Sequence, residues 1–225
     1  MYRIVADHKQ YIVIDKDPNV GFHTEDGVFG VAEQLKRDLG VEALYPVHRL
    51  DRMTSGLLLF AKNRQTARVL GEQFEQRQVQ KFYLALSDRK PKKKQGSVKG
   101  DMEKGRRGSW KLLISKNNPA VTQFFSCSVE PGLRLYLLKP LTGKTHQLRV
   151  AMKSIGAPIL GDGRYSTVDL DADERGYLHA YGLGFTLGGQ SPRFICPPTR
   201  GQVFNRPSFA QALLAYHDPW DLAWP

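Results

Sequence analysis

A polar segment that leads directly into an apolar run is the feature that most constrains this chain. Residues 46–62 read PVHRLDRMTSGLLLFAK, so Asp51 comes just before five consecutive apolar residues at 57–61. An unbroken apolar run of this length predicts a fully buried strand. The opposite charges of Arg49 and Arg52 favour the ionised form of Asp51. The segment therefore predicts a carboxylate at the edge of a buried strand, able to act as nucleophile, base or metal ligand.

The balance of charge points to a polyanionic partner. The 225 residues carry 33 lysines and arginines against 22 acidic residues, which gives a net charge of +11 and a pI of about 9.7. Such an excess suits RNA, DNA or an anionic membrane surface, and charge alone does not choose among them. The longest apolar run, at residues 57–61, is far too short to cross a bilayer. We therefore expect a polyanionic partner and no segment that spans a membrane.

Cysteine usage indicates a reducing compartment. Cys127 and Cys196 are far apart in the sequence and have no metal-ligand spacing, which excludes a disulfide framework of the small secreted kind. The first residues lack the apolar core of a signal peptide. We expect a reduced protein in the cytoplasm.

Hydrophobic periodicity predicts strands and helices that do not alternate strictly. No linker or repeat divides the chain, so we expect a single domain over residues 1–225. The fold class predicted is α+β, with a largely antiparallel, mixed sheet and flanking helices. We expect strands over residues 11–15, 56–61, 80–86, 121–129, 133–139 and 177–187, and helices over residues 28–39, 66–74, 145–154 and 208–216.

Residues 88–111 differ in composition from the rest of the chain. They hold ten lysines and arginines, three acidic residues and four glycines. We expect a mobile basic loop or a hairpin at the surface. An isolated charge run is usually a solvated surface, but beside a nucleic-acid site the same residues would contact phosphates, which dominate such affinity.

Several segments together resemble one enzyme family. Residues 48–56 read HRLDRMTSG and resemble the H-R-L-D-x-x-T-S-G signature of the RluA-type pseudouridine synthases, which act on ribosomal and transfer RNA. Further matches of the same kind are K-x-Y-x-A in residues 81–85, T-G-K-x-H-Q-L-R in residues 142–149, G-x-P-I-x-G-D-x-x-Y in residues 156–165 and L-H-A in residues 178–180. The resemblance covers about residues 11–215. It implies a pseudouridine synthase-like catalytic domain with a central basic cleft, without a separate N-terminal RNA-binding domain, cofactor or metal.

The resemblance assigns roles to three residues. Uridine isomerisation breaks the bond between N1 and C1′ and rejoins the base through C5, and Asp51 would act as the nucleophile that forms a transient covalent bond. Attack on C1′ of the sugar and attack on C6 of the base both remain open. Tyr83 would lie beside the flipped uracil and accept a proton, although a phenol with an ordinary pKa near 10 needs local help to do so. Arg149 would form the ion pair that orients Asp51.

Helical spacing gives Arg149 a second interpretation. In a helix that begins near Thr145, the side chains of His146, Arg149 and Lys153 share one face. By pattern alone this is the basic face of a surface helix, and only the resemblance favours a partner for Arg149 in the active site. We also expect His146 and His179 to make structural hydrogen bonds.

Further residues are candidates for contacts with the RNA. Either Arg49 or Arg52 would fill the space of the flipped base, and the other would be structural. His48 and Asp51 also form an H-x-x-D pair, but no second ligand cluster with matching spacing supports a metal site. The substrate-binding candidates are His48, Arg49, Arg52, Thr54, Lys144, Thr145 and His146.

Two other functions remain as alternatives to an RNA pseudouridine synthase. A catalytically silent RNA-binding protein on the same scaffold would keep all the RNA contacts, but it has no need of an ionised carboxylate that faces phosphates. A metal-dependent nuclease that uses His48 and Asp51 would lose its activity in a chelator. We expect the protein to be a monomer and its substrate to be a ribosomal or transfer RNA.

Overall fold

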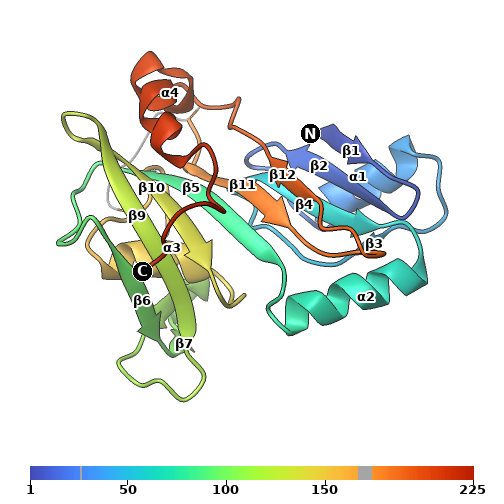
Figure 1. The fold of residues 1–225 in the computed structure, drawn as a ribbon, viewed down its shortest axis with the longest axis horizontal. Coiled ribbons are helices and arrows are strands. Elements are labelled where there is room, and N and C mark those ends of the chain that lie inside the picture. The colour runs from blue at the N-terminus through green and yellow to red at the C-terminus, as the bar shows by residue number, and fades with distance from the viewer. Residues whose placement is uncertain (26, 167–173) are drawn as a thin grey trace. The chain divides into compact units, whose positions relative to one another are not determined.

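The computed structural model describes residues 1–25, 27–166 and 174–225, and these residues form two compact units. Unit 1 consists of residues 1–81 and 179–198, and unit 2 of residues 82–178 and 199–225. Two strands run from one unit into the other, namely β5 (Gln80–Ser87) and β11 (Leu178–Gly184). Figure 1 shows the elements of both units.

Unit 1 is built on a sheet whose strands follow the order β1-β2-β4-β11, with β3 and β12 at its margins. The pair β4–β11 is parallel, and the other pairings of this sheet are antiparallel. All seven residues of β4 are buried, as the apolar run at 57–61 predicts. Besides β11, the elements of unit 1 are β1 (Tyr2–Asp7), β2 (Tyr11–Lys16), α1 (Val31–Asp38), β3 (Tyr45–Pro46), β4 (Ser55–Ala61), α2 (Arg64–Glu75) and β12 (Arg193–Ile195).

Helix α2 closes one side of unit 1. The side chain of Asn63 accepts a hydrogen bond from the N–H of Thr66 at 2.9 Å, which caps the first turn of the helix. The helix contacts β4 and buries Thr66 and Leu70. This packing holds the strand that follows Asp51.

Unit 2 is built on an antiparallel sheet whose strands follow the order β5-β10-β9-β6. A separate hairpin joins β7 and β8. The elements of unit 2 besides β5 are β6 (Gln95–Gly100), β7 (Met102–Lys104), η1 (Arg106–Gly108), β8 (Trp110–Leu112), β9 (Ala120–Glu130), β10 (Leu133–Pro140), α3 (Gln147–Ser154), η2 (Val203–Asn205), α4 (Pro207–Leu213) and η3 (Leu214–Tyr216).

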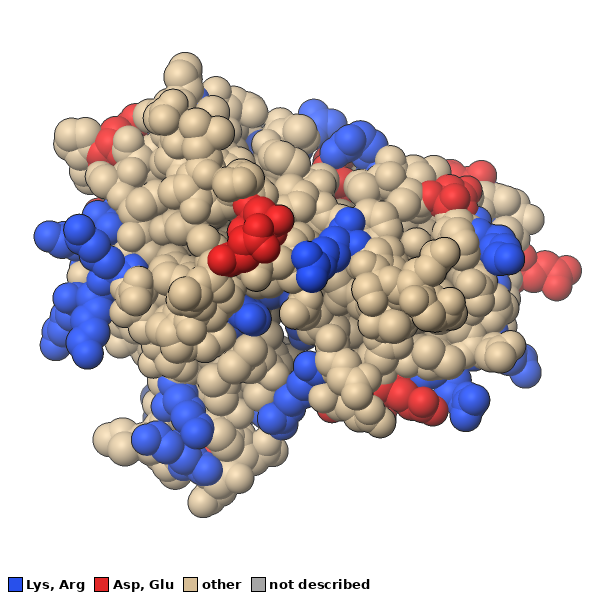
Figure 2. Space-filling view, in the orientation of Figure 1, with Lys and Arg blue, Asp and Glu red and all other residues tan. Residues whose placement is uncertain are grey.

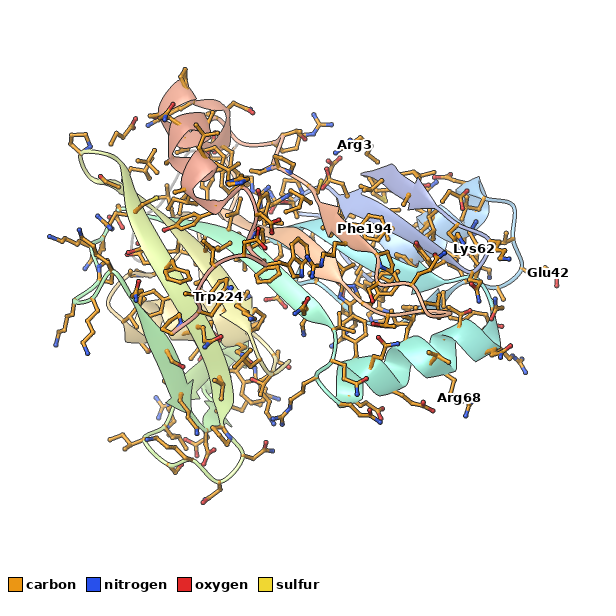
Figure 3. The ribbon with its side chains drawn as sticks, viewed as in Figure 1. Arg3, Glu42, Lys62, Arg68, Phe194 and Trp224 are labelled. Atoms are coloured by element: carbon orange, nitrogen blue, oxygen red, sulfur yellow. The ribbon has the colours of Figure 1, made fainter. Side chains whose placement is uncertain are left out.

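The two faces of the unit 2 sheet are covered by different segments. On one face Gln147 of α3 donates a hydrogen bond to the hydroxyl of Thr122 on β9 at 3.0 Å. On the other face the ring of Trp224 packs on Phe125, with ring centroids 4.9 Å apart. Thr122 and Phe125 differ by an odd number of positions, so their side chains point to opposite faces of the strand. Figure 3 shows Trp224 against this sheet.

The predicted fold class is confirmed, since helices flank a mixed and mostly antiparallel sheet. The strands expected over 121–129 and 133–139 are confirmed as the hairpin β9–β10. The helix expected over 208–216 is α4, which begins one residue earlier, at Pro207, and ends at Leu213. The helix predicted from residue 28 begins only at Val31. A Cβ on Gly30 would lie 2.4 Å from backbone atoms of Phe22 and His23, so the backbone at Gly30 packs directly on the preceding turn. The strand predicted over 177–187 is confirmed as the shorter β11.

The prediction of a loop over residues 88–111 is wrong for much of the segment, which forms strands, and the hairpin alternative is correct for part of it. The mobility of the segment stays a prediction. Strand β6 pairs with β9, and β7 pairs with β8. Val98 is buried on β6, and this apolar contact supplies order that composition did not indicate. Of the helices in the described part of the chain, none is long and apolar enough to span a membrane.

Candidate active site

Asp51 lies at the first position of a tight turn that leads into β4, an interior strand of the unit 1 sheet. The N–H of Thr54 donates to the carbonyl oxygen of Asp51 at 3.0 Å, and β4 begins at the next residue, Ser55. Asp51 is half-buried, whereas Thr54 is buried. The structure therefore places the predicted carboxylate where the sequence predicted it, at the end of a buried strand.

A buried lysine holds this turn. The side chain of Lys16 has no exposed surface, and its ammonium group donates to the carbonyl oxygens of Asp17, Val20 and Arg52 at 3.0, 2.8 and 3.2 Å. A buried ammonium group is costly unless its donors are satisfied. Lys16 therefore ties the loop after β2 to the turn after Asp51, a role that sequence analysis missed. The signal for it is the charged pair Asp15 and Lys16 at the end of a strand that is otherwise apolar, Tyr11–Lys16.

The glycine of the T-S-G motif is required by the pairing of β4 with β11. Gly56 lies opposite Ala180 in this parallel pair. A Cβ on Gly56 would lie 2.3 Å from the carbonyl oxygen of Ala180, and φ is +104° at this residue. Only glycine tolerates both conditions. The motif thus sets how β4, and with it the Asp51 turn, enters the sheet.

The arginines beside Asp51 are both exposed. The Nε of Arg52 donates to the carbonyl oxygen of Asn19 at 3.2 Å. Nη1 of Arg49 lies 3.3 Å from Nε2 of His23. The structure gives Arg52 a part in holding the loop. Which of the two occupies the space of a flipped base stays a prediction.

His48 has structural contacts. Its Nε2 accepts the N–H of Leu59 at 3.0 Å, and its ring stacks on Phe74 with centroids 4.7 Å apart. Burial, together with the positive charge of Lys81, lowers the pKa of His48 to about 3. The imidazole is therefore neutral and carries its proton on Nδ1. In this tautomer neither nitrogen offers a lone pair to a metal, which argues against the H-x-x-D metal pair.

A second polar cluster lies inside unit 1. Ligand atoms of Asp15, His179 and Cys196 lie within 4.8 Å of one another, and all three residues are buried. His179 already bonds through both ring nitrogens, Nδ1 to the hydroxyl of Ser55 and Nε2 to the carbonyl of Cys196, each at 2.7 Å. Burial raises the pKa of the Cys196 thiol to about 12, and Arg3 donates to the Asp15 carboxylate at 3.3 Å. A protonated thiol and an adjacent guanidinium suit a hydrogen-bonded cluster better than a cation site, and the expected structural role of His179 is confirmed.

In unit 2, Arg149 is buried and makes a bidentate pair with Asp162. Its Nε and Nη2 donate to the two carboxylate oxygens at 2.7 and 2.8 Å, and Asp162 has no exposed surface. Sequence analysis gave no role to Asp162, which lies in the G-x-P-I-x-G-D-x-x-Y segment at residues 156–165. The pairing of Arg149 with Asp51 in unit 1 stays a prediction.

The basic side chains around Arg149 converge on Tyr165. His146 Nδ1 lies 2.9 Å from the Tyr165 hydroxyl, and the cationic groups of Arg149 and Lys153 lie 5.0 and 5.6 Å from the centre of its ring. The expectation that the three share one face is confirmed, and so is a structural hydrogen bond for His146. The helix itself begins at Gln147 rather than Thr145, because His146 has a φ of 55°. Arg149 is buried, His146 is half-buried and Lys153 is exposed, so only the middle of this face is shielded from solvent.

Tyr83, Lys144 and Thr145 also belong to unit 2. Tyr83 is half-buried on β5, opposite Leu138 of β10. Lys144 and Thr145 lie in the loop before α3, where the N–H of Lys144 donates to the side-chain oxygen of Gln147 at 3.0 Å. The structure therefore groups Tyr83, Lys144, Thr145, His146 and Arg149 in unit 2, and His48, Arg49, Asp51, Arg52 and Thr54 in unit 1.

The turn at Asp51 and the buried Arg149 both fall within a region that matches one protein family. The family model described as RNA pseudouridylate synthase matches residues 10–154. The chain belongs to this family, which makes it an isomerase of the pseudouridine synthase class.

Among individual relatives, the chain is 45% identical over 213 residues to an uncharacterized RNA pseudouridine synthase of Haemophilus influenzae, a match that covers 95% of each protein. It is 35% identical to ribosomal large subunit pseudouridine synthase C of Haemophilus ducreyi, over 89% of this chain and 63% of that protein. It is 36% identical to ribosomal large subunit pseudouridine synthase D of Borreliella burgdorferi, over 76% and 55%. The chain thus spans less than two thirds of the length of the last two.

Solved structures show the same fold. Human RNA pseudouridylate synthase domain containing 1 superposes with a TM-score of 0.73 at 25% identity, over 88% of this chain and 84% of that one. Human RNA pseudouridylate synthase domain containing 4 superposes with a TM-score of 0.70 at 25% identity, over 96% and 93%. The α+β fold predicted from the resemblance is therefore that of pseudouridylate synthase domains.

Proposed function

We propose that this enzyme isomerises specific uridines in ribosomal or transfer RNA, with Asp51 as the nucleophile. The observation that carries the proposal is the turn in which Lys16 and the start of β4 hold Asp51 just before a buried strand. A carboxylate in a fixed position can attack without first being ordered, which lowers the entropic cost of the reaction.

The proposed chemistry needs only groups of this chain. The N1–C1′ bond breaks, a C5–C1′ bond forms, the proton on C5 leaves, and N1 takes up a proton from water, so the product is an isomer of uridine. Asp51 forms a transient ester with C1′ or adds to C6 of the base, and the bond to Asp51 breaks again when the base has been rejoined. Tyr83 is the proposed stacking partner of the uracil and acceptor of the C5 proton.

Arg149 is the proposed partner of the Asp51 carboxylate. Asp162 accepts hydrogen bonds from two nitrogens of the Arg149 guanidinium. Asp162 thereby fixes the plane of the guanidinium, and a fixed plane can orient a second carboxylate. Ionic pairing of this kind would keep Asp51 deprotonated.

Unit 2 offers an exposed basic surface for the RNA backbone. Figure 2 shows lysine and arginine side chains gathered over the connection from β5 to β6 and around the β7–β8 hairpin. The exposed residues of this basic surface are Arg89, Lys90, Lys92, Lys93, Lys94, Lys99, Lys104, Arg106, Arg107 and Lys111. We propose that they contact phosphates, with His48, Arg49, Arg52, Thr54, Lys144, Thr145 and His146 nearer the target nucleotide. The protein is proposed to act as a cytoplasmic monomer.

Release of tritium from RNA labelled at C5 of uridine tests the proposal. Ribosomal and transfer RNA that lack the modification should each be incubated with the protein, with and without a chelator. Release from at least one fraction, unchanged by the chelator, is expected. Tight RNA binding without release would favour a silent RNA-binding protein, and chelator-sensitive cleavage of the RNA would favour the nuclease.

A further inference from the structure

Unit 2 contains a hollow beside the β7–β8 hairpin. Its walls come from Asp101 and Trp110 on the hairpin side, Asn117 and Asn118 in the loop before β9, and Lys144 and Thr145 in the loop before α3. Its volume is ≈ 400 Å³, which lies in the range of about 300–1,000 Å³ typical of small-molecule sites. None of the proposed catalytic residues lines it.

The hollow is held in shape by hydrogen bonds. The carboxylate of Asp101 accepts the N–H groups of Asn117 and Asn118 at 3.0 and 2.8 Å, and its own N–H donates to the carbonyl of Ser115 at 2.8 Å. The backbone N–H of Trp110 donates to the hydroxyl of Tyr165 at 2.8 Å. Tyr165 also contacts the buried Arg149, so the hollow is anchored to the same framework as that arginine.

The chemistry of the walls selects among ligands. Trp110 is half-buried and offers an indole surface on which a flat ring can stack. The Asp101 carboxylate faces the same hollow, and hydrogen bonds from the N–H of Asn117 and other donors lower its pKa. An ionised carboxylate repels a phosphate group. The site therefore suits a neutral aromatic ring with hydrogen-bond donors. Lys144, which also lines the hollow, could bind a phosphate attached to that ring.

We infer that this hollow binds an unpaired nucleobase of the RNA substrate, stacked on Trp110 and donating an exocyclic amino group to Asp101. A carboxylate offers roughly four acceptor positions, and the N–H groups of Asn117 and Asn118 and the hydroxyl of Ser115 account for three. Acidic side chains typically accept from the amino group of cytosine. Uracil has no amino group, so the base in this hollow is not the target uridine but a neighbour that helps select the RNA. The inference rests on the proposed action on RNA.

Binding of short unstructured RNAs tests the inference. We suggest fluorescence anisotropy with dye-labelled oligocytidine and oligouridine of equal length. Wild-type protein is expected to bind oligocytidine more tightly. Base–aromatic stacking contributes about 1–3 kcal/mol per base, so Trp110→Ala should weaken oligocytidine binding by about fivefold or more. Trp110→Phe should recover most of the loss, which a merely structural role for the indole would not predict.

Lys111→Gln is the matched control. Lys111 follows Trp110 on β8, is exposed, and pairs with Glu103 at 2.6 Å outside the hollow. It should weaken both oligonucleotides alike, by the loss of one charge. Equal binding of both RNAs by wild type, or a Trp110→Ala variant that binds like wild type, would overturn the inference. Tritium release distinguishes the two proposals. If wild type releases tritium but Trp110→Ala leaves oligocytidine binding unchanged, only the base site is refuted. If Trp110→Ala weakens oligocytidine binding but wild type releases no tritium, only the isomerase activity is refuted.

Discussion

The guanidinium of Arg149 is fixed by Asp162 through two hydrogen bonds of 2.7 and 2.8 Å. Both side chains are buried, with exposed fractions of 9% for Arg149 and 0% for Asp162. Charges in such surroundings are stable only while they are paired and hydrogen-bonded. The pair thus gives unit 2 a rigid cation next to the ring of Tyr165.

Asp162→Asn should destabilise the protein strongly. Removal of one partner from a buried ion pair costs about 3–5 kcal/mol, because the other charge stays buried without compensation. The expected result is a clear fall in the free energy of unfolding, measured by urea titration. Glu103→Gln serves as the control, since its pair with Lys111 is exposed and worth about 1 kcal/mol at most. Equal effects of the two substitutions would contradict the structural role of Asp162.

Lys16→Met should damage catalysis more than RNA binding. The substitution leaves three backbone carbonyl groups without their donor and releases the turn that holds Asp51. We expect a loss of stability on the order of 2–4 kcal/mol and a fall in kcat, with RNA affinity within a few-fold. Stopped-assay kinetics below the unfolding temperature separate the two effects. Lys9→Met, at an exposed lysine, should change neither stability nor kcat. A Lys16→Met variant with normal kcat would show that the turn is held without Lys16.

Replacement of Lys92, Lys93 and Lys94 by Gln should flatten the salt dependence of RNA binding. The slope of log K against log salt concentration is negative, and each phosphate that the protein no longer neutralises reduces its magnitude by about 0.7–0.9. The three side chains are exposed on the connection from β5 to β6. Affinity measured from low to moderate salt gives the slope directly. Lys9, Arg64 and Arg68 are also exposed and, replaced together by Gln, form the charge-matched control; an equal fall in slope there would remove the special role of the basic surface.

His48 should make the protein less stable as the pH falls. Burial lowers its pKa in the folded state to about 3, whereas an unfolded histidine titrates near 6.5. The unfolded state therefore binds more protons between these values. The stability that neutral His48 contributes is complete above about pH 6.5, and it declines by up to about 1.4 kcal/mol per pH unit as the pH falls toward 3.

Urea titrations at pH 7 and pH 5 measure this decline. His48→Gln should show a smaller loss of stability than wild type over the same interval, because Gln does not titrate. His217→Gln, at an exposed position, controls for the loss of an imidazole from the surface. A His48 variant with the wild-type pH dependence would mean that His48 is not neutral in the folded state.

The sequence predicts those parts of the fold that depend on local pattern. The apolar run at 57–61 predicts β4. The same run predicts that Asp51 lies outside the strand, because burial of a charged residue in it would cost free energy. Pro131 and Gly132 predict the β9–β10 hairpin. The family signature predicts the fold class and the enzyme class, both of which are confirmed.

Other features depend on contacts between distant segments and could not be predicted from spacing. Helix α1 begins only after Gly30, because the backbone at Gly30 packs on His23. Asp162 reaches Arg149 from a glycine-flanked turn, and nothing in its neighbours marks it as buried. The basic segment over 88–111 resembles a loop in composition, but pairing of β6 with β9 orders it. In all three cases a contact with a segment distant in the sequence determined the local structure.

The central claim is that Asp51 performs the chemistry, and tritium release by Asp51→Asn tests it most directly. Asn preserves the size of the side chain but removes the nucleophilic charge. We expect that the variant releases no tritium from C5-labelled RNA under conditions in which wild type does, while its RNA affinity stays within a few-fold. Release at the wild-type rate by Asp51→Asn would contradict the role of Asp51 as the nucleophile.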